Sequence, residues 1–433
     1  MPTAWKYDID IYDRPGWHSY TYSFPGGGGI RKRLNGEIVI RFDSADGSGI
    51  NDDFYVEHYR QVVLSSMDNG LTWEEIEPYW QYHMPVELSD GTLLDIVDER
   101  SMETAEDARA RMKERGLKHL WHDDCLLAWD LWPVEMADEL RQQGLIMWDT
   151  VQGDCADRKF LPDGTVAVLS ASDFFVRKST DNGNTWKQSI LEGPDISSFG
   201  HLAPCFAGSA VLPDDTVLVP FYGVERKSIS TGRFDDDFQP AVFIMRSADK
   251  GEIWQRIDID SSAGAGFNES CVVAHPSGRA IILIRTGDEG GIIYRAVSDD
   301  GGLTWTKPER TPMKGMPINA ICLQSGNILC TYTHRWHPAG IYACLSCDAG
   351  ETWDIENEKL LRNAYIPSTY IGGPGSVQLE DGTIFTMYSI VRIENPKPED
   401  RLVEEQQLVM NPRYHCFVAG SRYTEDYVRV LGS

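Results

Sequence analysis

Residues 296–305 read AVSDDGGLTW, and the pattern Ser-x-Asp-x-Gly-x-Thr-Trp within them recurs along the 433-residue chain. The Asp can accept hydrogen bonds from the backbone N–H groups that follow it, and the Gly can adopt a positive φ in a tight turn. The Trp then buries a large ring on the returning strand. Four further copies begin at Ser66, Ser179, Ser247 and Ser346, the third of them with Ile253 in place of Thr. The pattern predicts a series of hairpin turns, each anchored by a tryptophan.

A second repeat consists of short apolar runs on either side of a tight turn. Asn-Gly and Asp-Gly pairs between such runs favour β-hairpins. Seven turns of this kind occur, at Asn35-Gly36, Asp90-Gly91, Asp163-Gly164, Asp214-Asp215, Ser277-Gly278, Ser325-Gly326 and Asp381-Gly382. Regular repeats of this size indicate a propeller or a solenoid. We therefore predict an all-β fold, a single β-propeller of four-stranded antiparallel blades over residues 1–433, with seven blades favoured over six.

Residues 101–148 interrupt the repeat and are predicted to form a small helical insertion within the propeller. Residues 103–115 are polar, rich in Ala and followed by Gly116, which is typical of a helix with a Gly cap. Residues 133–143 begin with Pro and are followed by Gly144, which predicts a second helix. The Trp-rich segment between them is expected to pack on one rim of the propeller, and stacking on sugar rings is the alternative. Oligomers could form through this insertion.

Composition limits the partners of the protein. A formal net charge of −26 argues against nucleic acid or an anionic membrane as a partner, although a few local arginines can still bind an anionic substrate. Nine cysteines without a framework spacing predict reduced thiols. The N-terminal residues lack the features of a secretory signal, and no apolar run is long enough to span a bilayer. We expect a cytoplasmic protein.

The repeated pattern resembles the Asp boxes of the sialidase superfamily, β-propellers whose blades carry this turn between the third and fourth strands. Sialidases hold the carboxylate of the substrate with three arginines and cleave with a Tyr nucleophile, its Glu partner and an Asp acid/base. Phe267-Asn268-Glu269, leading into Ile284-Arg285, is similar to the segment that carries the Glu partner and one of the arginines. The chemistry is consistent, because a carboxylate can take the proton of a phenol and a guanidinium can bind a carboxylate through two hydrogen bonds.

The same resemblance implies roles for four further residues. Arg31 is similar to the arginine of the first strand in the family, and Asp46 or Asp52 lies in the loop where the family places its acid/base. Tyr370 lies close to the position of the nucleophile. No arginine occurs between Arg362 and Arg392, so the triad is incomplete. The resemblance is therefore to the superfamily, and a true sialidase is not implied.

Propeller geometry predicts that one mouth of the channel is lined by the starts of the innermost strands and the ends of the second strands. Polar residues at these positions are candidates for substrate binding: Arg158, Arg226, Arg335 and His83. His201 and His334 are candidates for proton transfer, since an imidazole titrates near neutral pH. For His201 and His83, the alternative interpretation is that they are hydrogen-bonded residues of inner strands. The spacing of His334 and His337 is weak support for a metal site, and we expect none.

Three functions are compatible with these residues. We favour a glycoside hydrolase that cleaves a bond of an acidic or deoxy sugar, because ionisable groups at one mouth are typical of an active site. A lyase that cleaves next to a uronate by β-elimination, with His as the proton shuttle, is the first alternative. A non-catalytic glycan-binding propeller is the second, since Asp boxes also occur in binding proteins. We expect an acidic oligosaccharide as the substrate and no cofactor.

Overall fold

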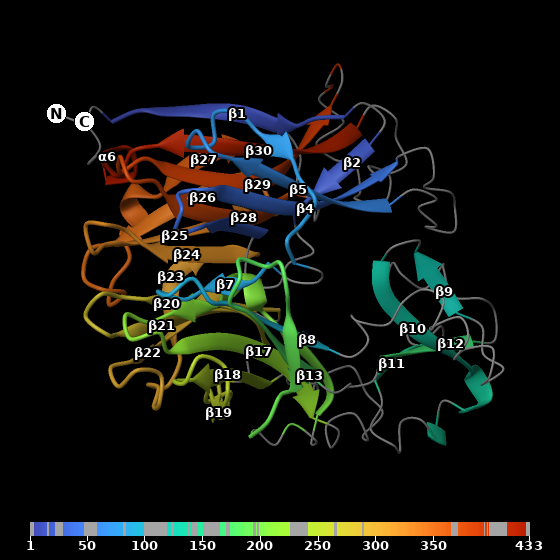
Figure 1. Ribbon diagram of the computed structural model, residues 1–433. Coiled ribbons are helices and arrows are strands. Elements are labelled where there is room, and N and C mark those ends of the chain that lie inside the picture. Colours follow the sequence, from blue (N-terminus) through green and yellow to red (C-terminus); the bar gives the residue numbers. More distant parts are fainter. Residues whose placement is uncertain are drawn as a thin grey trace.

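The computed structural model describes most of the chain, in twenty segments: residues 4–14, 17–21, 29–46, 59–80, 84–98, 119–122, 125–136, 138–139, 146–149, 165–169, 174–193, 196, 199–225, 241–263, 266–287, 290–364, 371–393, 395, 397 and 414–429. These residues form seven antiparallel sheets and very little helix. Six of the sheets are the blades of a β-propeller, so the predicted fold class is confirmed (Figure 1).

The blades follow one another in chain order. Blade 1 contains β2 (Trp17–Tyr20) and β3 (Gly29–Lys32), which both pair with β4 (Ile38–Asp46), then β5 (Tyr59–Ser66) and β6 (Glu74–Glu75). Blade 2 contains β7 (Val86–Glu87), β8 (Leu93–Asp98), β13 (Phe174–Ser179) and β14 (Lys187–Ile190). Blade 3 contains β15 (Phe199–Pro204), the 3₁₀ turn η4 (Phe206–Gly208), β16 (Ala210–Val211), β17 (Val217–Glu225), β18 (Ala241–Ser247) and β19 (Gln255–Asp258).

The next two blades are the most regular. Blade 4 contains β20 (Phe267–Ala274), β21 (Ala280–Thr286), β22 (Ile292–Ser298) and β23 (Glu309–Lys314). Blade 5 contains β24 (Ile318–Cys322), β25 (Ile328–His334), β26 (Gly340–Ser346), the 3₁₀ turn η5 (Ile355–Asn357) and β27 (Lys359–Asn363). Apolar side chains of the two blades pack face to face, with Ile281 and Leu283 against Tyr332 and Cys330. Burial between blades is therefore the main force that holds neighbouring sheets together.

Blade 6 closes the ring with strands from both ends of the chain. It contains β28 (Gly372–Gln378), β29 (Ile384–Ile393) and β30 (Tyr414–Tyr423), and its outer strand is β1 (Lys6–Tyr12). Ion pairs support this closure: Arg362 Nη1 lies 3.1 Å from Asp8 Oδ2, and Arg392 Nη2 lies 2.7 Å from Asp10 Oδ2. A short helix, α6 (Glu425–Arg429), follows β30. The N-terminal strand is thus an integral part of the propeller.

The prediction of seven blades was wrong, because one hairpin belongs to an additional sheet. β9 (His119–His122), β10 (Cys125–Pro133), β11 (Ile146–Asp149) and β12 (Thr165–Leu169) form a separate four-stranded sheet between β8 and β13. Figure 1 shows this sheet beside the six blades, on the right. The predicted turn at residues 163–164 lies outside the described residues, but the strand that follows it in the sequence, β12, belongs to this additional sheet and not to a blade. The hairpin at Asp90-Gly91 and the box at Ser179 both belong to blade 2, because β8 pairs with β7 and with β13.

The segment predicted as a helical insertion is largely strand where the structure describes it. The first predicted helix, residues 103–115, lies outside the described residues. In the second, residues 133–143, the described helical turns are η2 (Val134–Met136) and residues 138–139. The strands lie in the Trp-rich segment before this predicted helix and in the residues after it, because aromatic residues have a high propensity for strands. No helix of the described residues is long and apolar enough to cross a membrane.

The five predicted boxes are confirmed as turns between the third and fourth strands of blades 1 to 5. In blade 4, Asp300 accepts hydrogen bonds from Thr304 N at 2.9 Å and Thr304 Oγ1 at 2.6 Å. Gly302 has a φ of +86°, and its N–H donates to Ser298 Oγ at 2.8 Å. Trp305 Nε1 donates to the carbonyl of Gly302 at 3.2 Å. The Asp300 carboxylate, the Ser298 and Thr304 hydroxyls and the Trp305 N–H therefore all have partners within the turn.

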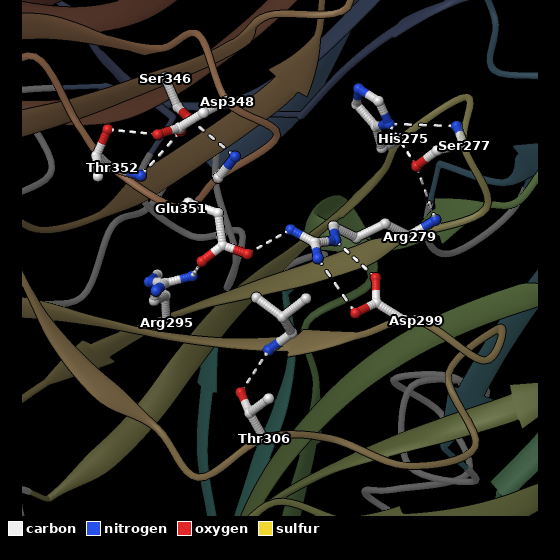
Figure 2. Close-up of polar contacts among 12 residues, drawn as sticks. His275, Ser277, Arg279, Arg295, Asp299, Thr306, Ser346, Asp348, Glu351 and Thr352 are labelled. Carbon is white, nitrogen blue, oxygen red and sulfur yellow. Dashed lines mark hydrogen bonds and ion pairs between the residues drawn. The ribbon is translucent and has the colours of Figure 1, made fainter.

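Charged side chains of the first hairpin of blade 4 link the box of the same blade to the box of blade 5 (Figure 2). Arg279, after the Ser277-Gly278 turn of blade 4, donates to Asp299 Oδ1 at 2.7 Å and to Glu351 Oε1 in blade 5 at 2.5 Å. Arg295 lies 3.2 Å from Glu351 Oε2. Because third strands run toward the boxes and second strands run away from them, this face lies opposite the predicted mouth. The box face is thus a closed network of structural contacts.

Candidate active site

A β-bulge at the start of β20 creates the central feature of the opposite face. Phe267 pairs with Thr286 and Ser270 pairs with Ile284, so Asn268 and Glu269 together oppose the single residue Arg285. A bulge of this kind changes the direction in which side chains point. Here it places the Glu269 carboxylate on Arg285, with Nη1 of the guanidinium donating to Oε2. The pair is about four-fifths buried, with exposed side-chain fractions of 20% for Glu269 and 21% for Arg285.

The remaining polar atoms around this pair are less well satisfied. Arg285 Nη2 lies 3.6 Å from Met316 Sδ, which is a weak acceptor, and Arg285 Nε has no hydrogen-bond partner among the described residues. Asn268 Oδ1 is likewise buried without a partner among them. A buried guanidinium or amide group without partners costs free energy, and a ligand that supplies the partners regains it. Arg285 therefore has donor capacity suited to an anion, whereas Asn268 Oδ1 is an acceptor and suits a hydroxyl or amide donor.

A phenol and a thiol from blade 3 contribute to the surroundings of the pair. Burial raises the pKa of Tyr222, at the end of β17, and the negative charge of Glu269 adds to this shift. Burial also raises the pKa of the Cys205 thiol, whose Sγ accepts the N–H of Ser270 at 3.5 Å. Both groups are therefore neutral at pH 7. They surround the ion pair with protein of low polarity, which strengthens electrostatic interactions there.

Arg31 is brought to the axis of the propeller but is already bound. From β3 of blade 1 its guanidinium reaches η4 of blade 3, across the position of blade 2. Nη2 donates to the carbonyl of Phe206 at 2.8 Å, and Nη1 donates to the carbonyl of Ala207 at 3.1 Å. Burial lowers the pKa of Arg31. The structure thus gives Arg31 a bridging role between blades, because both of its terminal nitrogens donate to blade 3, whereas Nη2 of Arg285 has only a sulfur contact.

His334, at the end of β25, is the middle of an aromatic stack. Its ring centroid lies 3.9 Å from that of Tyr342 and 5.1 Å from that of Trp336. Lys314 Nζ lies 4.7 Å from the centroid of Trp336. Neither ring nitrogen of His334 has a hydrogen-bond partner among the described residues. Burial lowers the pKa of His334, and the nearby carbonyl groups of Lys314 and Pro338 oppose this shift without reaching hydrogen-bond geometry.

The other predicted site residues are placed only in part. Asp46 is the last residue of β4 and His201 lies in β15, opposite Val224, but their side chains are not among the described ones. Strand β4 includes residues 43–46, so this part of the predicted acid/base loop is strand. Arg335 follows β25 and is half-buried. Five predicted residues lie outside the described parts of the chain: Asp52, His83, Arg158, Arg226 and Tyr370.

Three features of the site were not predicted from the sequence. Met316 contacts Arg285 from the start of blade 5, and Lys314 and Trp336 extend the stack around His334. Trp336 could have been noticed, because an aromatic residue between two histidines after an apolar strand is unusual at an exposed edge. Met316 and Lys314 carry no such pattern. Among the described residues, no three His, Cys, Asp or Glu side chains converge as metal ligands would.

A six-bladed propeller with Asp boxes on one face and a carboxylate–guanidinium pair at the other mouth has the architecture of the sialidase superfamily. A family model described as a BNR repeat-like domain matches residues 163–385, about half of the chain. The chain therefore belongs to the BNR repeat-like domain family. It is a BNR-repeat propeller of the sialidase superfamily.

Individual proteins are more distant. An anhydrosialidase from Macrobdella decora is 27% identical over 146 residues, which are 33% of this chain and 17% of that protein. A protein of unknown function from Dyadobacter fermentans has a similar structure, with a TM-score of 0.63 and 21% identity over 98% of this chain and 100% of that one. The NanB sialidase from Streptococcus pneumoniae gives a TM-score of 0.55 and 13% identity, over 97% of this chain and 71% of that one. These structural likenesses concern the fold.

Proposed function

We propose that the protein is a glycoside hydrolase that cleaves a bond of an acidic sugar at the channel mouth. The observation that carries this proposal is the Glu269–Arg285 pair, held at a bulge with an unsatisfied guanidinium nitrogen. Arg285 binds the sugar carboxylate, because a planar guanidinium matches a carboxylate in charge and geometry. The name of the relative from Macrobdella decora, an anhydrosialidase, supports a substrate of this class.

Glu269 has the second role in this proposal. In the absence of a ligand it neutralises Arg285, and when the substrate carboxylate binds, its own carboxylate becomes available to orient or activate a nucleophile or a water molecule. An aspartate of residues 43–53, with Asp46 and Asp52 as candidates, supplies the proton for the leaving group. Tyr370 is the candidate nucleophile. Because the Glu269–Arg285 pair is buried, the sugar carboxylate can replace that of Glu269 on Arg285 only if it fits the guanidinium well.

Turnover of acidic glycosides by two matched arginine variants tests the proposal. Arg285→Met removes the guanidinium from the mouth, whereas Arg295→Met removes one from the box face of the same blade. We expect the first variant to lose turnover of an aryl glycoside of a carboxylated sugar and the second to retain it. Equal activity of both variants, in folded protein, would exclude Arg285 from substrate binding.

Elimination next to a uronate is a second candidate, favoured by His334. Its pKa is lowered, so the ring is neutral at pH 7 and able to accept a proton, and its nitrogens have no partner among the described residues. The two reactions give different products, since elimination creates a carbon–carbon double bond that absorbs in the ultraviolet. A product without this absorbance, together with a free reducing sugar, identifies hydrolysis.

A further inference from the structure

A second cluster lies next to the Glu269–Arg285 pair, on the loops of blades 4 and 5. It consists of Lys314 at the end of β23, Trp336 after β25, and His334 and Tyr342 beneath Trp336 in the stack. The stack runs from a buried tyrosine to an exposed lysine, with Lys314 Nζ 4.7 Å from the Trp336 centroid. We call these four residues the blade 5 stack.

The blade 5 stack is separated from Arg285 by one side chain. Met316 Sδ contacts Arg285 Nη2 at 3.6 Å. Met316 also packs on Gly291, where an added Cβ would lie 2.9 Å from Met316 Cε and 3.2 Å from Trp336 Cη2. Gly291 has a φ of +84°, so both space and backbone conformation require glycine there. The chain is therefore built to seat Trp336 and Met316 side by side next to the arginine.

Lys314 has an unusual setting for a lysine of this protein. Lys178 and Lys250 form ion pairs, with Glu252 at 2.7 Å and with Asp90 at 2.5 Å, whereas Lys187 on the edge strand β14 has none among the described contacts. Lys314 has no carboxylate partner among the described residues and rests instead against the Trp336 ring. Lys314 therefore places a cation beside the candidate site of a chain whose net charge is −26.

We infer that the blade 5 stack is a second sugar subsite that takes an anionic residue next to the acidic sugar held by Arg285. In this arrangement the anionic group of the second sugar pairs with Lys314, and the ring of that sugar lies against Trp336. Tyr342 and His334 hold the indole in place from the other side, since stacked rings restrict its rotation. The inference rests on the proposed function and narrows its substrate to oligosaccharides with acidic groups on two successive sugars.

Binding titrations with two probes separate the subsites. The first probe is α2,8-linked disialic acid, which carries two carboxylates, and the second is 3′-sialyllactose, which carries one. We expect the protein to bind the dianionic probe about fivefold more tightly, the effect of one exposed ion pair. The preference should decrease when the salt concentration is raised from 0.05 to about 0.5 M, because exposed charges are screened.

Four variants test whether the preference for the dianionic probe depends on the blade 5 stack. Lys314→Met should remove the preference for the dianionic probe and leave the affinity for sialyllactose unchanged. Lys187→Met removes a positive charge from the exposed edge strand β14 and is the control. This variant should still bind the dianionic probe more tightly than sialyllactose. Trp336→Leu should lower the affinity for both probes, and Trp336→Phe, which keeps an aromatic ring, should retain part of it. Retention of the preference in Lys314→Met, or its absence in the unmodified protein, would overturn the subsite.

Arg285→Met distinguishes this inference from the proposed function. If both are right, the variant loses most of its affinity for both probes. If Arg285→Met binds both probes normally while Lys314→Met still loses the preference, the subsite stands and the role of Arg285 is wrong. If neither substitution alters binding of the two probes, both assignments are wrong.

Discussion

The two faces of blade 4 use charged residues in opposite ways. On the box face, Arg279 and Arg295 have their donors on carboxylates of neighbouring turns, and Asp300 is fully occupied by its own turn. At the mouth, Arg285 has one strong partner, one sulfur contact and one nitrogen without a partner among the described residues. Both faces belong to the same four strands. The difference indicates that the charged residues of the box face stabilise the fold, whereas the donors of Arg285 at the mouth are available to a ligand.

The largest expected effect is on catalysis. Arg285→Met should lower kcat/KM for a carboxylated aryl glycoside by about 10²–10³, the loss typical of one removed electrostatic contact in an active site. Arg295→Met should change kcat/KM less than about twofold, because Arg295 lies on the box face. Its partly exposed ion pair contributes only about 1 kcal/mol or less to stability, so the variant should stay folded. Steady-state kinetics on folded protein measure both. The comparison of faces fails if Arg295→Met is the more damaging change.

The next effect concerns stability on the box face. Trp254→Ala removes a side chain that is only 2% exposed and should lower the free energy of unfolding by about 3–5 kcal/mol. Its neighbour Ile253, which is 60% exposed, is the matched control, and Ile253→Ala should change stability by about 0.5 kcal/mol or less. Denaturant titrations give both values. In each variant, activity per folded molecule should stay unchanged, and a specific loss of activity in Trp254→Ala would contradict the division between faces.

A smaller effect depends on pH. The hydroxyl and backbone N–H of Thr304 lower the pKa of Asp300 to about 2, below the ordinary value of 3.8. Because the folded pKa is the lower one, this stabilisation is present above about pH 4 and is lost as the pH falls toward 2. Asp300→Asn should therefore lower stability by about 0.5–1 kcal/mol at pH 7, since it removes the negative charge that accepts these hydrogen bonds and solvent screens an exposed charge.

The difference between Asp300→Asn and the unmodified protein should narrow as the pH falls below about 4. Thermal unfolding between pH 2.5 and 7 records this change. Asp299→Asn is the control, because Asp299 binds Arg279 and no backbone group of the turn in the described contacts. A difference that stays constant over this range would show that the Asp300 carboxylate is not specifically stabilised as an anion.

The fold could be predicted well because its determinants are local. Each box carries its own hydrogen bonds within eight residues, so the sequence pattern identifies the turn directly. The number of blades was not predictable in the same way. A hairpin pattern such as Asp163-Gly164 shows that two strands pair, but it does not show which sheet they join, and here they join the additional sheet.

The candidate site was predictable only where strand pairing determines it. The sequence singled out Glu269 and Arg285 as site residues, and they lie on paired strands, but it did not predict the ion pair between them. Arg31 reaches a 3₁₀ turn of blade 3, and Lys314 reaches a loop of blade 5. Such contacts depend on how blades pack around the axis, which no local pattern encodes. The roles proposed for Asp46, Asp52, Tyr370 and His201 stay predictions.

A crystal structure of the protein with an uncleaved acidic sugar tests the central claim most directly. We predict that the sugar carboxylate binds the guanidinium of Arg285, that Glu269 turns from Arg285 toward the anomeric carbon, and that the ring lies at the mouth between blades 3 and 5. A sugar bound elsewhere, with the Glu269–Arg285 pair unchanged, would contradict the claim that this pair is the substrate site.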